Sequence, residues 1–96
     1  MSQHTEFYKS VIQRFGLAQQ VDMAIEEMSE LILTLCHHRR ARVRRDDVIS
    51  ELADVKIMVD QLSVHFGEEL VNKEVERKLN RLKTYMTTGE YNRDNN

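Results

Sequence analysis

Apolar residues recur along this chain at intervals of three and four positions, the spacing that places side chains on one face of an α-helix. Proline is absent, and three glycines divide the sequence into segments of helical length. The pattern predicts four helices. They cover residues 5–15 with Thr5 as the N-cap, residues 17–39, a segment that follows Asp46 and Asp47 and ends at Phe66, and residues 68–88.

The predicted connections are short, which favours antiparallel packing of neighbouring helices. We therefore expect an all-α fold, a four-helix bundle formed by a single domain over residues 1–96, with residues 90–96 as a frayed polar tail. The apolar stripes are wide for a chain of 96 residues, which has a large surface relative to its volume. A homodimer is the expected minimum unit, with a homotetramer as the alternative.

The composition narrows the function classes. Lys and Arg number 14 and Asp and Glu 16, so the formal net charge of -2 argues against a general nucleic-acid binder or a protein of acidic membrane surfaces. Cys36 is the single cysteine, which excludes an internal disulfide and a multi-cysteine metal cluster. The sequence shows neither a signal peptide at its start nor a transmembrane run, and we expect a soluble protein of the cytoplasm.

The two middle helices carry acidic residues beside their apolar stripes. Glu27 and Glu30 are three residues apart on one helix, and Glu51 and Asp54 repeat this spacing on the next. No lysine or arginine occurs at residues 22–35 to offset the negative charge. Like charges at this spacing destabilise an isolated helix. If the helices pack side by side, the two pairs face each other across the groove.

Carboxylates that converge in a partly desolvated site repel one another unless a cation neutralises them. A ligand set made only of oxygen atoms favours Mg²⁺, Mn²⁺ or Ca²⁺ over zinc or copper. A di-iron carboxylate bundle would need Glu-x-x-His on two helices, which this chain lacks. The alternative is a solvated helix face that happens to be acidic.

The acidic blocks at residues 26–30 and 51–54 read E-E-x-x-E and E-x-x-D. With their apolar flanks they resemble the signature of the MazG-like all-α nucleoside triphosphate pyrophosphohydrolases, over about residues 17–83. The resemblance implies hydrolysis of NTPs or dNTPs between the α and β phosphates, giving the monophosphate and pyrophosphate, as in nucleotide-pool house-cleaning. It also implies catalytic acids that bind Mg²⁺, or Mn²⁺ in its place: Glu27, Glu30, Glu51 and Asp54.

The resemblance implies that Glu26 acts in catalysis either by supporting the metal ligands without binding the metal or by orienting the attacking water. It also favours Lys73 and Arg77 as phosphate-binding residues, although neighbouring acids are equally typical of a salt-bridged surface. Gln20 lies seven residues before Glu27, on nearly the same helix face, and is a candidate contact for the base or sugar. The sequence does not indicate which base is bound or whether diphosphates are substrates.

Two further features have more than one interpretation. Residues 39–45 contain five arginines, which suits a solvated loop, a contact with the nucleotide, or a contact with acids of another subunit better than nucleic-acid binding. Cys36 has apolar neighbours and is expected in the core. The rival to the enzyme hypothesis is a non-enzymatic helical module that dimerises through its apolar stripes.

Overall fold

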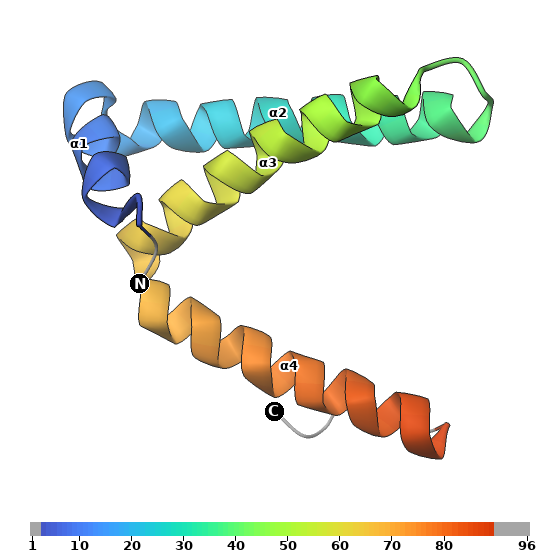
Figure 1. The fold of residues 1–96 in the computed structure, drawn as a ribbon. Helices are drawn as coiled ribbons and strands as arrows, with labels where there is room; N and C mark the ends of the chain where they lie inside the picture. The colour runs from blue at the N-terminus through green and yellow to red at the C-terminus, as the bar shows by residue number, and fades with distance from the viewer. Residues whose placement is uncertain (1–2, 90–96) are drawn as a thin grey trace. The chain divides into compact units, whose positions relative to one another are not determined.

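A computed structural model of the chain describes residues 3–89, and these residues are helical with short connections (Figure 1). The helices are α1 (Thr5–Phe15), α2 (Leu17–Arg39), α3 (Arg45–Phe66) and α4 (Glu68–Thr88). No strand occurs in residues 3–89, so the all-α prediction is confirmed. The predicted frayed tail at residues 90–96 lies outside the described residues.

The helix boundaries follow the sequence closely, with two corrections at N-termini. Thr5 is the first residue of α1, and His4 occupies the N-cap position that we had assigned to Thr5. Helix α3 begins at Arg45, before the two aspartates rather than after them. The backbone N–H of Arg44 donates a hydrogen bond of 2.9 Å to Asp47 Oδ2. Asp47 therefore stabilises the start of α3 from inside its first turn, where a carboxylate also complements the helix dipole.

Helices α1 and α2 are joined by a single residue, Gly16. Its φ of 90° lies in a region that L-residues rarely adopt, so glycine permits the reversal of direction at this point. Its N–H donates a hydrogen bond of 2.8 Å to the carbonyl of Ile12, which satisfies an acceptor at the end of α1.

Helix α2 ends in a Schellman motif built on alanine. The N–H of Ala41 donates to the carbonyl of His38 at 2.9 Å, and the N–H of Arg42 donates to the carbonyl of His37 at 2.9 Å. Ala41 has a φ of 55°, a position where glycine is usual. The motif stops the helix and starts the five-residue connection to α3.

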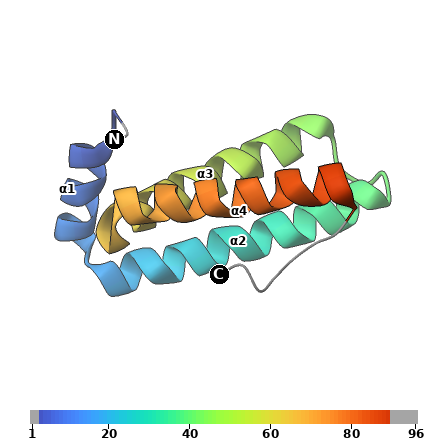
Figure 2. The same ribbon diagram turned by 90° about the horizontal axis from the view of Figure 1, so that it is seen from below.

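The chain divides into two compact units, residues 1–66 and residues 67–96. In the first unit α2 and α3 form an antiparallel hairpin, and α1 packs against both helices (Figure 2). Residues 40–44 form the tip of this hairpin. The second unit contains α4, on which Arg77 donates hydrogen bonds of 2.6 and 3.0 Å to the carboxylate of Glu74.

The buried residues of the first unit are few and half of them are polar. Tyr8, Ala24 and Met58 are the buried apolar residues, and Thr5, Gln20 and Gln61 are buried with them. Gln20 of α2 and Gln61 of α3 are each 3% exposed, and Gln61 Nε2 donates a hydrogen bond of 2.5 Å to Gln20 Oε1. This amide pair ties the two helices of the hairpin together near α1.

Many large apolar side chains are exposed within their own unit. None of the helices in residues 3–89 is both long and apolar enough to cross a membrane. The exposed apolar side chains occupy the faces that the sequence pattern identified as apolar stripes. Among them are Ile25, Ile32 and Leu35 on α2, Ile49, Leu52 and Ile57 on α3, and Leu70, Val75, Leu79, Leu82 and Met86 on α4.

Candidate metal centre

The α2–α3 hairpin brings three of the predicted acids together. Glu27 comes from α2, and Glu51 and Asp54 come from successive turns of α3. Each of the three is half-buried, and one carboxylate oxygen from each lies within 4.8 Å of the other two. Since Glu27 and Glu51 are far apart in the sequence, their proximity is a product of the hairpin's register.

The spacing of these oxygens suits a divalent cation. Magnesium binds oxygen at 2.0–2.1 Å in octahedral geometry, so two ligands on opposite sides of the ion lie about 4.2 Å apart. Separations of up to 4.8 Å are close to this value. The ligand set consists only of oxygen atoms, which is the chemistry that Mg²⁺ and Mn²⁺ prefer.

Two of the carboxylate oxygens are buried without a partner. Glu27 Oε2 and Glu51 Oε2 are shielded from solvent and form no hydrogen bond with any atom of residues 3–89. Buried polar atoms in proteins are almost always hydrogen-bonded, and a pair of exceptions on adjoining carboxylates requires an explanation. A cation between the carboxylates would satisfy both oxygens and offset their charge.

The electrostatics of the cluster point in the same direction. Desolvation raises the pKa of Glu27, and the nearby charges of Glu30, Asp54 and Glu51 raise it further. Desolvation is also the main cause that raises the pKa of Glu51, and the negative charges of Glu30, Asp54 and Asp47 raise it further. Within residues 3–89, every charged group that shifts either pKa is another carboxylate. The protein therefore holds a concentration of negative charge for which its own cations do not compensate.

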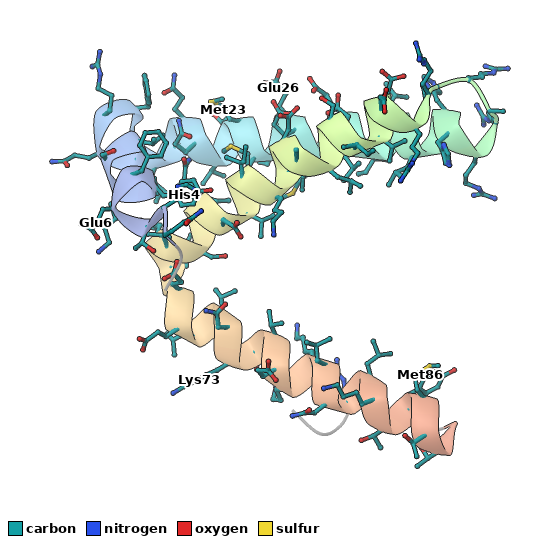
Figure 3. All side chains as sticks on the ribbon, in the orientation of Figure 1. His4, Glu6, Met23, Glu26, Lys73 and Met86 are labelled. Atoms are coloured by element: carbon teal, nitrogen blue, oxygen red, sulfur yellow. The ribbon has the colours of Figure 1, made fainter. Side chains whose placement is uncertain are left out.

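The other two acids of the signature lie at the margin of this cluster. Glu30 is exposed and is not among the three residues whose oxygens converge, although its charge acts on both Glu27 and Glu51. Glu26 is exposed on α2 (Figure 3), and its charge contributes the weakest of the effects on Glu27. The structure thus places three of the four predicted ligands together and leaves Glu30 beside them.

The predicted substrate-binding residues have different surroundings. Gln20 is buried and accepts the hydrogen bond from Gln61, while its own amide nitrogen lies 3.7 Å from the sulfur of Met23. Lys73 extends from α4 (Figure 3) and is exposed. Arg77 is half-buried on the same helix and is paired with Glu74, whose pKa is lowered mainly by this hydrogen bond. Gln20 is therefore placed as an internal residue of the hairpin.

Two features of this region were not foreseen from the sequence, and one expectation was wrong. Asp47 adds to the negative charge around Glu51, which the four-residue spacing between them signals in retrospect. Gln61, the partner of Gln20, carries no sequence signal of its own. Cys36 is exposed rather than in the core.

Comparison with known proteins found no relative of this chain. No family model, no curated protein and no solved structure matches the chain. The functional interpretation therefore depends on the residues and on the geometry that brings them together.

Proposed function

We propose that this protein is a Mg²⁺-dependent nucleoside triphosphate pyrophosphohydrolase that cleaves NTPs or dNTPs between the α and β phosphates. The observation that carries the proposal is the cluster of Glu27, Glu51 and Asp54, with two buried carboxylate oxygens that lack a partner. The sequence signature of the acids, E-E-x-x-E and E-x-x-D, supports the same assignment. Nucleotide-pool house-cleaning in the cytoplasm is the role that fits this activity.

Glu27, Glu51 and Asp54 are the residues that would hold the cation. Glu30 is exposed and its charge acts on both Glu27 and Glu51, so in this proposal it is the fourth ligand and would join the other three through a change of side-chain conformation. Bound Mg²⁺ polarises the phosphoanhydride, offsets the charge of the phosphates and lowers the pKa of an attacking water. Glu26 is suited to orient water, because it lies beside the cluster and keeps an exposed carboxylate.

Phosphate groups also require donors from the protein. Lys73 and Arg77 lie four residues apart on α4, so they share one face of that helix. Arg77 exchanges its hydrogen bonds with Glu74 for phosphate in this proposal, and Lys73 already has an exposed ammonium group. Both side chains offer the cationic donors that phosphate oxygens accept.

Self-association belongs to the same proposal. Apolar side chains on α2, α3 and α4 are exposed in numbers that are unusual for a monomer, including Ile32 and Leu35 together with Ile49 and Leu52. A homodimer or homotetramer would bury these faces and complete a MazG-like helical bundle. The rival function, an interaction module without catalysis, rests on these apolar faces alone and gives no reason for the cluster of half-buried acids.

A matched pair of variants on α3 tests the proposal. Asp54→Asn keeps the size of a cluster residue and removes its charge, and Asp60→Asn makes the same change at another half-buried aspartate of the helix. With a panel of canonical and modified NTPs and dNTPs, we expect Asp54→Asn to lower turnover at least ~100-fold, because charge stabilisation by the metal dominates this chemistry. Asp60→Asn should retain turnover.

Two results would contradict the proposed activity or the role of Asp54 in it. If wild-type protein hydrolyses no member of the panel in Mg²⁺ or Mn²⁺, the interaction module becomes the better assignment. If Asp54→Asn retains full turnover, Asp54 does not belong to the site.

A further inference from the structure

The connection between α2 and α3 concentrates positive charge at the tip of the hairpin. Arg39, Arg40, Arg42, Arg44 and Arg45, here called the arginine loop, are all exposed. No lysine or arginine occurs at residues 17–38, and Lys56 is the single one at residues 46–64. The basic surface of the hairpin is therefore confined to its tip.

These guanidinium groups are not used to neutralise acids of the hairpin. Within residues 3–89, none of the five arginines forms an ion pair, whereas Lys9 pairs with Glu6 and Arg77 with Glu74. Of the two acids in the first turn of α3, Asp46 and Asp47, the second accepts a hydrogen bond from the backbone N–H of Arg44. Five like charges on one loop repel one another, and an anion bound there would offset this repulsion.

Hydrogen bonds to the end of α2 fix the backbone at the start of the arginine loop. The Schellman motif fixes Ala41 and Arg42 against the last turn of α2 and pairs the carbonyls of His37 and His38. A hollow of about 250 Å³ opens beside this motif and is lined by Cys36, Arg39 and Arg40. Arg39 and Arg40, two of the three residues that line the hollow, carry guanidinium groups, the planar, multidentate donors that recognise phosphate.

We propose that the arginine loop is a phosphate-binding site that captures the polyphosphate chain of a nucleoside triphosphate. The choice of this ligand rests on the function proposed above. Arg45 precedes Glu51 by six residues, which is about 9 Å along the axis of α3. The Debye length at physiological salt is about 8 Å, comparable with this separation, so screening weakens the attraction of the loop for an anion at the acidic cluster without abolishing it. The loop thereby counteracts the repulsion that the carboxylates impose on the substrate.

The size and surroundings of the loop favour a nucleotide over a nucleic-acid strand. A long polyanion that crossed the loop would continue over the acids of the same hairpin, among them the exposed Asp22, Glu26 and Glu30. A triphosphate carries about four charges, which five adjacent arginines match without further basic surface. Nucleic-acid binding normally uses basic residues spread along a face, which α2 and α3 lack.

The test measures binding of inorganic tripolyphosphate by calorimetry without divalent metal, so that the acidic cluster does not contribute. The variant is the triple substitution Arg40→Gln, Arg42→Gln and Arg44→Gln. The matched control removes three charges elsewhere through Lys56→Gln, Lys78→Gln and Lys83→Gln, all at exposed positions. At low ionic strength we expect the arginine variant to bind at least ~10-fold more weakly than wild type, about 1.4 kcal/mol, and the control to bind as wild type does.

Each result decides the inference. Absence of tripolyphosphate binding by wild-type protein, or an equal loss in the lysine control, would overturn it. Tighter binding of a single-stranded oligonucleotide through the same arginines would also overturn it, since the site would then serve nucleic acid. If wild type hydrolyses no nucleotide but binds tripolyphosphate through the loop, the proposed catalysis fails while the phosphate site stands.

Discussion

The buried hydrogen bond between Gln20 and Gln61 gives a sharp test of the hairpin's structure. Both side chains are 3% exposed, and Gln61 Nε2 lies 2.5 Å from Gln20 Oε1. Gln20→Leu leaves the amide of Gln61 buried without its acceptor, and Gln61→Leu leaves the oxygen of Gln20 without its donor. An unsatisfied buried polar group costs about 1–3 kcal/mol. Each kilocalorie shifts the melting temperature of a domain of this size by about 4–8 °C.

The double substitution should behave differently from the sum of its parts. With both amides replaced by leucine, no polar group is left unpaired, and the change is expected to be nearly neutral. Urea unfolding of the wild type, both single variants and the double variant should therefore give a coupling free energy equal to the sum of the two single losses, about 2–6 kcal/mol in magnitude. Gln19→Leu, at an exposed neighbour, serves as the control and should stay within about 0.5 kcal/mol of wild type.

A loss of less than ~0.5 kcal/mol in each single variant, or a double variant that loses the sum of the two single losses, would show that this hydrogen bond does not stabilise the hairpin. The same variants examine the sequence-based prediction that Gln20 contacts the base or sugar. If Gln20→Leu raises KM for a nucleotide without lowering stability, Gln20 serves the ligand rather than the hairpin.

Three further outcomes follow from the structure. Ala41→Gly should stabilise the protein by about 0.5–1 kcal/mol in urea unfolding. Glycine relieves the strain of the positive φ of 55°, and this gain exceeds the cost of the additional chain entropy that glycine loses on folding. A loss of stability would show that Ala41 does not adopt this conformation. The raised pKa values of Glu27 and Glu51 mean that, without metal, the native state holds protons that the unfolded state releases near pH 4.5, so stability should fall as pH rises through the native pKa values. Substitution of both residues by glutamine should flatten this pH dependence, and an unchanged profile would assign it to other groups. The exposed apolar faces predict a homodimer or larger, which light scattering coupled to size exclusion would contradict by finding a folded 11.4 kDa species at tens of micromolar.

The helical fold was predictable from the sequence where the helical spacing of apolar residues and the positions of the glycines determine the helix bounds. The bounds of α1, α2 and α4 coincide with the apolar pattern and its glycines. The predicted start of α3 was wrong because aspartate stabilises a helix both as the N-cap residue and within the first turn. Asp47 acts from within the first turn. Residue type alone does not distinguish these two cases.

The candidate site was predictable by residue type and only partly by geometry. Equal three-residue spacing on both helices did not reveal that Glu27, Glu51 and Asp54 converge while Glu30 stays at the margin, because this depends on the rotation of α2 against α3. Gln20 and Glu27 share a helix face, yet their seven-residue separation is about 10 Å along α2, where Gln61 covers Gln20. Helical periodicity specifies a face but not which neighbouring element covers it.

The most direct test of the central claim follows the products of nucleotide hydrolysis by ³¹P nuclear magnetic resonance, with and without Mg²⁺. If Glu27, Glu51 and Asp54 hold a catalytic cation, wild-type protein with Mg²⁺ should convert a nucleoside triphosphate into the monophosphate and pyrophosphate, and chelation of the metal should stop the reaction. Release of orthophosphate and the diphosphate would place the cleavage at a different bond. An unchanged triphosphate spectrum across the substrate panel would contradict the assignment of this acidic cluster as a hydrolytic metal centre.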